Sequence, residues 1–208
     1  MAELTHALFS IVFLLFALTV HESAHAWVAF RLGDPTAQRE GRISLNPLRH
    51  LDLFWSVLLP LSCYLSGAPL FGGGKPVPVN PYNFRDPRRD STLVSLAGPA
   101  SNLLLALIVI LLMIPVKRFL SQGSFNHLYS LIQINVLLGA FNLIPVPPLD
   151  GSQIMKYFLR GRLLHSFCRL EPYGMLILLA VLVTRIHYWF IVPFFSLYGW
   201  LLNTLLRL

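Results

Sequence analysis

The sequence predicts an all-α integral membrane protein, a helix bundle of about five full spans plus one re-entrant hairpin. Of the 208 residues, 55% are hydrophobic and only 12% are charged, and the mean hydropathy is +0.64. An ordinary soluble domain is far less apolar. Six apolar segments alternate with short polar connections. We therefore expect residues 1–208 to form a single membrane domain.

The apolar segments place the helices in order along the chain. The first runs from about Ala7 to Phe30; an acid but no Lys or Arg precedes it, and no small-residue cleavage pattern follows, so we expect it to be retained. The fifth is short for a span, and we expect it to begin near Leu170 or to pack against other helices. The segments after the first are Leu53–Phe71, Leu93–Val116, Leu128–Pro145, Tyr173–Thr184 and Trp189–Leu206.

The charge of the chain indicates a membrane partner and no nucleic acid. The formal net charge is +7 and the pI is near 9.9, but no nucleic-acid recognition motif accompanies this charge. Basic residues in membrane proteins mark the cytoplasmic loops. Cys63 and Cys168 lie in unrelated segments, so we predict no disulfide.

A histidine pair and a glutamate lie inside the first apolar segment, in the stretch HESAH from His21 to His25. Residues i and i+4 share one face of a helix, so both imidazoles can bind one zinc ion, with Glu22 beside it as the base for bound water. The alternative is two histidines that are hydrogen-bonded within the bundle. That alternative needs three separately satisfied polar groups in an apolar helix, so we favour zinc.

Asp150 is the candidate for the third zinc ligand. It follows an apolar run in the stretch NLIPVPPLDGS, where three prolines prevent a regular helix. An acid beside a broken helix is typical of a lined polar cavity. Asp150 could instead belong to a simple turn or cap the next helix.

These motifs, in this order, resemble those of the site-2 proteases, a family of intramembrane zinc metalloproteases. The resemblance rests on HESAH, on SLAGPASN from Ser95 to Asn102, and on NLIPVPPLDG from Asn142 to Gly151. It covers about residues 5–174, the expected catalytic core, and matches the last spans at about residues 170–208 only loosely. It describes a compact bacterial-type member without PDZ or CBS domains.

The resemblance assigns a role to each of these residues. It implies one Zn²⁺ per chain held by His21, His25 and Asp150, Glu22 as the catalytic base, and Asn142 near the scissile carbonyl. It also implies a substrate with a single transmembrane helix. Asn102 lies among small residues and is a second candidate for substrate or oxyanion binding, although a bridge between helices is the favoured reading for it.

The zinc site constrains the topology. His21 lies about 14 residues, or roughly 21 Å, into its span, beyond the midplane. Asp150 reaches the same side only if Leu53–Asp90 enters and leaves by one face as a re-entrant hairpin. One face then collects the residues Arg31, Arg39, Arg42, Arg49, Lys75, Arg85, Arg88, Arg89, Lys156, Arg160, Arg162, Arg169 and Arg207, and the other has only Lys117, Arg118 and Arg185.

The positive-inside rule makes the first of these faces cytoplasmic. We therefore expect a multi-pass protein of the inner (plasma) membrane, with the N-terminus outside, the C-terminus cytoplasmic, and the zinc toward the cytoplasmic side.

The stretch GKPVPV, from Gly74 to Val79, is too rich in proline and glycine to be helical. We hypothesise that Gly74, Lys75, Val77 and Val79 pair with an unwound substrate as an added strand. The alternative is a plug that fills the cavity.

Two other functions are compatible with intramembrane histidine and aspartate: a zinc transporter, and a non-catalytic relative that binds membrane helices. Glu22 beside the ligands, and a single metal constellation, favour hydrolysis over transport. A non-catalytic protein would have no need of Glu22.

Overall fold

The computed structural model is all-helical over the residues that it describes, which are 2–52, 58, 62 and 73–206. The hairpin predicted at Leu53–Phe71 lies almost wholly outside these residues. The longer helices are α1 (Ala2–Arg31), α4 (Pro87–Val116), α5 (Gln122–Asn142), α6 (Asp150–Phe158), α7 (Gly161–Leu170), α8 (Gly174–Val183) and α9 (His187–Leu206). Short helical turns join them: α2 (Thr36–Arg39), η1 (Pro47–Arg49), η3 (Pro81–Asn83), η4 (Lys117–Phe119) and η5 (Glu171–Tyr173).

Local sequence explains where the bundle helices begin and end. Asp86 caps α4 by accepting hydrogen bonds from the backbone N–H groups of Arg88 and Arg89, and Pro87 occupies the first helical position. Ser121 caps α5 by accepting from the N–H of Ser124 at 3.1 Å. Helix α5 ends at Asn142, just before the proline-rich stretch.

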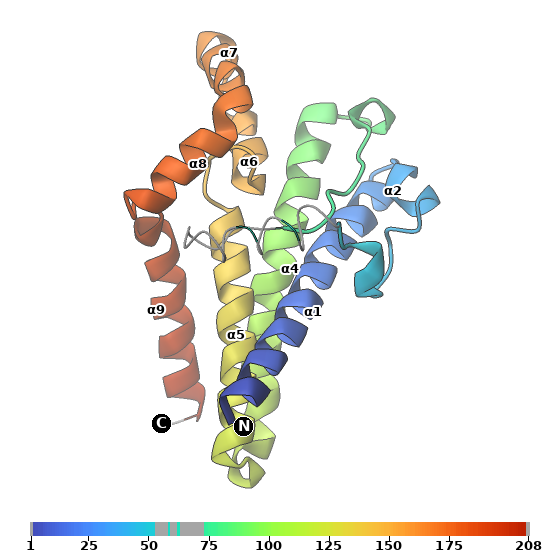
Figure 1. Cartoon of the computed structure of the whole chain (residues 1–208). Helices are drawn as coiled ribbons and strands as arrows, with labels where there is room; N and C mark the ends of the chain where they lie inside the picture. The colour runs from blue at the N-terminus through green and yellow to red at the C-terminus, as the bar shows by residue number, and fades with distance from the viewer. Residues whose placement is uncertain (1, 53–57, 59–61, 63–72, 207–208) are drawn as a thin grey trace.

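Helices α1, α4 and α5 run side by side, and α9 packs against α4 and α5 (Figure 1). A buried apolar cluster joins α4, α5 and α9. Tyr198 of α9 also donates a hydrogen bond to Leu103 O of α4 at 2.6 Å. The members of the cluster are Ala106, Val109, Ile110, Met113, Ile132, Val136, Leu202 and Leu206. The bundle therefore holds together at the end away from α6 and α7.

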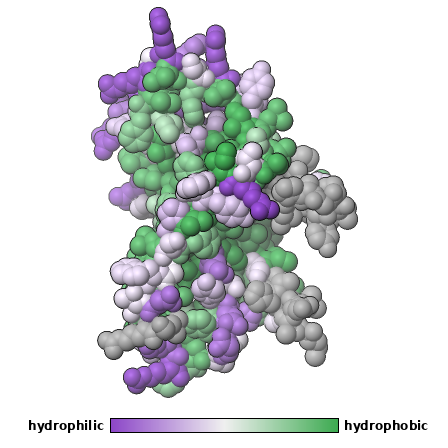
Figure 2. Space-filling view, turned by 90° about the vertical axis from the view of Figure 1, so that its left-hand side faces the viewer, coloured by the Kyte–Doolittle hydropathy of each residue, from purple (hydrophilic) through white to green (hydrophobic). Residues whose placement is uncertain are grey.

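Four runs are long and apolar enough to cross a membrane: Leu8–Arg31, Pro87–Phe119, Gly161–Val183 and His187–Leu206. Apolar side chains cover large parts of the face in Figure 2, and long hydrophilic side chains project from its upper end. The chain is thus an all-α membrane protein, as predicted from its composition.

The expected placement of the two chain ends on opposite faces is wrong. Lys117, which follows α4, donates a hydrogen bond to Leu206 O at the end of α9, and both chain ends lie at the lower end of Figure 1. Helix α8 has ten residues, about 15 Å in length, and runs downward in Figure 1 toward α9. Arg185, with φ of 61°, ends α8 in the left-handed conformation, and α9 then continues toward the same end.

Both ends of the undescribed stretch meet at one place. The backbone N–H of Lys75 donates to His50 O at 2.7 Å, although 25 positions separate the two residues. The described residues on either side of this stretch therefore lie next to each other.

Candidate metal centre

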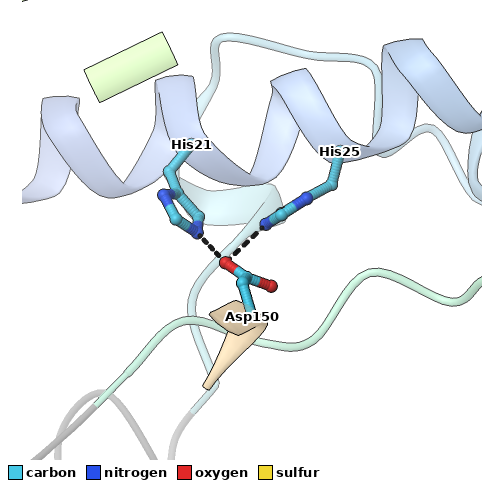
Figure 3. Close-up of side chains that lie close together, drawn as sticks. All are labelled: His21, His25 and Asp150. Carbon is cyan, nitrogen blue, oxygen red and sulfur yellow. Dashed lines mark hydrogen bonds and ion pairs between the residues drawn. The ribbon is translucent and has the colours of Figure 1, made fainter. Parts of the chain in front are cut away.

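Three side chains far apart in sequence converge between α1 and α6. Asp150 Oδ2 lies 3.1 Å from His21 Nε2 and 3.3 Å from His25 Nε2 (Figure 3). The ligand atoms of all three residues lie within 4.8 Å of one another, and both histidines are buried. Asp150 is the first residue of α6. The non-helical stretch between α5 and α6 places it against the histidine face of α1.

Hydrogen bonds on the far side of each ring fix which nitrogen faces Asp150. His21 Nδ1 lies 2.7 Å from Asn102 Oδ1, and His25 Nδ1 lies 2.7 Å from Val94 O. Both oxygens can only accept, so each Nδ1 carries a hydrogen and Nε2 is the nitrogen of each ring that faces Asp150 and could bind a metal ion. This is the usual arrangement of metal-binding histidines.

The orientation of the Asn102 amide is itself fixed by two acceptors. Its Nδ2 donates to Ala17 O and to Asn135 Oδ1, each at 3.0 Å, so Oδ1 must face His21. Asn135 in turn donates to Leu131 O at 2.9 Å. Both asparagines are completely buried. The chain of amides therefore links α4 and α5 to a candidate ligand on α1.

Gly98 of α4 leaves the space that a bound ion would need. A Cβ atom at this position would lie 2.3 Å from His25 Nε2 and 2.6 Å from His21 Nε2. Two imidazole Nε2 atoms and a carboxylate thus face one small pocket, and a nitrogen and oxygen donor set of this kind suits zinc. The residues present fit a three-ligand zinc centre.

Glu22 lies between the ligands and the extended segment. Its side chain is half-buried and lines the same cavity of about 600 Å³ as His21, His25 and Asp150. A Cβ atom at Gly74 would lie 3.1 Å from Glu22 Oε1. The predicted base therefore faces the space in which a substrate would meet the metal.

The two predicted asparagines occupy different places. Asn142 lines the cavity and donates through Nδ2 to Leu138 O at 3.0 Å, which leaves the second Nδ2 hydrogen for another acceptor. Asn102 is not among the cavity-lining residues; it lies behind His21. For Asn102, this position favours the bridge between helices over contact with substrate.

The predicted pairing segment borders the cavity through Gly74, Val77 and Val79. It is extended but unpaired, and among the described residues the backbone N–H and C=O groups of Val77 and Val79 have no hydrogen-bond partner. Lys75 is exposed, and its backbone is held by His50 O and by Arg42.

Sequence reasoning missed several residues that build this site. Asn135, Gly98, Asp34 and Arg42 were not singled out, although an asparagine in an apolar helix is a sign of a buried polar contact. Burial acts to raise the pKa of Asp34, but hydrogen bonds from Thr36, Asn80 and Asn83 outweigh burial and hold this pKa below its ordinary value.

Comparisons with known proteins find one family model and several relatives that match this chain. Peptidase family M50 matches residues 111–184. "Putative zinc metalloprotease YwhC" of Bacillus subtilis is 38% identical over 84% of this chain and 80% of its own length. "Putative zinc metalloprotease Rip2" of Mycobacterium tuberculosis H37Rv is 32% identical over 91% of this chain and 71% of its own. No solved structure matches the chain at a comparable significance.

Proposed function

The chain belongs to peptidase family M50, and from this premise we propose that it is an intramembrane zinc metalloprotease. It hydrolyses peptide bonds in or near the transmembrane segment of membrane-protein substrates. The observation that carries this function is the convergence of His21, His25 and Asp150 beside Glu22 in one cavity. The family assignment offers no support for a zinc transporter or for a non-catalytic helix-binding protein.

His21, His25 and Asp150 would hold the zinc, with Nε2 of each ring and Oδ2 of the carboxylate as ligands. When bound, zinc lowers the pKa of its water and polarises the scissile carbonyl. Glu22 accepts the proton of the attacking water and delivers it to the leaving amine. Its half-buried carboxylate has the required access to the cavity.

Asn142 donates its free Nδ2 hydrogen to the scissile carbonyl oxygen, where negative charge develops. The amide is preorganised because its other hydrogen is already bonded to Leu138 O. Removal of a comparable donor typically costs about 100-fold to 1,000-fold in kcat.

The extended segment pairs with the substrate. A helical substrate has its peptide groups locked in internal hydrogen bonds, so hydrolysis requires an unwound stretch held in place. Val77 and Val79 offer free backbone donors and acceptors at the cavity edge, and strand addition uses such groups. Gly74 allows the segment to approach Glu22 closely.

The substrate that this site suits best is a membrane protein with a single transmembrane helix. The metal end of the bundle carries most of the basic residues, so it faces the cytoplasm of an inner (plasma) membrane protein. The N-terminus and Leu206 then lie on the opposite, outer side.

Cleavage of a tagged single-span substrate by the wild type and by Glu22→Gln tests the function. We expect cleavage to fall at least about 100-fold in the variant while zinc content stays at one per chain. Equal cleavage by the two proteins would reject Glu22 as the catalytic base. Zinc transport that survives the substitution, with no cleavage by the wild type, would favour a transporter.

Val77→Pro tests the pairing segment, because proline removes the backbone donor. We expect cleavage of a helical substrate to fall more than cleavage of an already unwound one. If cleavage of both substrates falls equally, the pairing role is rejected and the segment acts as a plug that fills the cavity.

A further inference from the structure

Two buried charged side chains form hydrogen bonds to the backbone at the two ends of the extended segment, residues 75–80. Asp34 lies between α1 and α2 and Arg42 follows α2, and they are 0% and 2% exposed. Among the described residues, neither forms an ion pair with an oppositely charged side chain. Buried charges without a counter-ion are costly, so their contacts are informative.

Arg42 holds the first end of the segment. Its Nη1 donates to Arg49 O at 2.6 Å, and its Nη2 donates to Lys75 O and, at 3.1 Å, to Pro76 O. One rigid guanidinium thus joins the loop before the undescribed stretch to the chain after it. A lysine has a single nitrogen and cannot reproduce this fork.

Asp34 holds the second end. Its Oδ2 accepts from the backbone N–H of Asn80 at 2.7 Å, and its Oδ1 accepts from Asn83 Nδ2 at 2.7 Å. Thr36 donates to the same Oδ1 from both its N–H and its hydroxyl group. The carboxylate therefore ties the residue after Val79 to the end of α1.

Between these contacts the segment is fixed but unpaired. The side chain of Val79 packs on the buried cluster of Ala29, Phe84 and Val94, whereas the backbones of Val77 and Val79 have no partner among the described residues. Each charged side chain bonds to backbone groups at one end of the segment, and among the described residues the edge between these contacts has no partner.

We propose that Asp34 and Arg42 are positioning residues that hold residues 75–80 as a preformed edge for pairing with the unwound substrate. This inference rests on the proposed function and extends it. An edge that is rigid before binding loses little conformational entropy when the substrate pairs with it. A loose segment would have to be ordered by each substrate molecule.

The test compares Arg42→Lys and Asp34→Asn with two matched controls at the end of α2, Arg39→Lys and Glu40→Gln. Both control side chains are exposed. The full-length protein is purified in detergent, and its zinc content is measured. Steady-state cleavage of a helical and of an unwound substrate is followed, and amide hydrogen exchange of residues 73–80 is recorded by mass spectrometry.

For the helical substrate we expect a fall of about 10-fold in kcat/KM, mainly through KM, because each change removes a charge-assisted hydrogen bond from the segment. The unwound substrate should be affected less. Arg42→Lys should speed exchange of the Lys75 amide, which bonds to His50 O, and Asp34→Asn should speed exchange of the Asn80 amide. Zinc content should stay at one per chain.

Two outcomes overturn the proposal in distinguishable ways. If both variants match their controls in exchange and in KM while Val77→Pro still impairs cleavage of the helical substrate selectively, the pairing function stands and the positioning role fails. Exchange could instead rise in both variants while these variants and Val77→Pro lower cleavage of the helical and the unwound substrate equally. In that case Asp34 and Arg42 hold the segment, but the pairing function fails.

Discussion

Gly98→Ala should displace the candidate zinc ligands while it changes the chain by one methyl group. The new Cβ would lie 2.3 Å from His25 Nε2, whereas real Cβ atoms hardly ever approach closer than 3.0 Å. The His25 ring, or α4 itself, must therefore retreat by about 0.7 Å, and metal sites tolerate deviations of only about 0.2 Å in ligand distance. We expect the dissociation constant for zinc to rise at least about 10-fold to 100-fold.

Competition with chelators of graded affinity measures this constant directly, without reference to cleavage. Gly139→Ala is the matched control, because its Cβ would lie 2.8 Å from Leu103 Cγ, at the contact of α4 and α5, and so disturbs packing without meeting the histidines. Gly199→Ala, which meets no atom within 4 Å, controls for helix propensity. If Gly98→Ala binds zinc as tightly as Gly139→Ala, the site geometry is wrong.

Three further results are expected. Asn135→Ala should weaken zinc binding about 10-fold by freeing the amide that orients His21, whereas Asn126→Ala on the same helix should not; equal affinities would contradict this relay. The stability that Asp34 confers should be present above the unfolded-state pKa of about 3.9 and lost as pH falls through the lower folded-state pKa. In thermal melts, the melting temperature of the wild type should thus exceed that of Asp34→Asn at pH 7, and the gap should close as the pH falls below the ordinary range of an aspartate; a constant gap would refute this. Arg88→Ala should lower the free energy of unfolding by about 1–2 kcal/mol, because Arg88 Nη2 donates to Tyr157 O at 2.7 Å at the end of α6, and unchanged denaturation would count against that contact.

Most of the bundle follows from hydrophobic runs and caps. The run predicted at Leu93–Val116 lies within α4, and the last run agrees with α9. The predicted side of the C-terminus is wrong at α8, which was expected to be a short span or to pack against other helices. Its ten residues instead join α9 in one descent, and this reverses the side on which the chain ends.

The candidate ligands were accessible to sequence reasoning because their spacing reflects the helix repeat, and because Asp150 follows a stretch in which prolines forbid a helix. Their roles as ligands stay predictions until metal is measured. Asn135, Asp34 and Arg42 were not accessible in this way. Each acts through backbone or amide groups brought near by the fold, and such partners leave no periodic or spacing signal along the chain.

The amide of Asn102 gives the ion a second effect, on the assembly of the bundle. From α4 it reaches His21 and Ala17 on α1 and Asn135 on α5, so three helices meet at one side chain that contacts a candidate ligand. Ion affinity and helix association are then thermodynamically linked, and saturation at 1,000 times the dissociation constant would add about 4 kcal/mol to the folded state. Chelation should loosen the junction of these helices first, and the melting temperature of the protein should rise with free zinc.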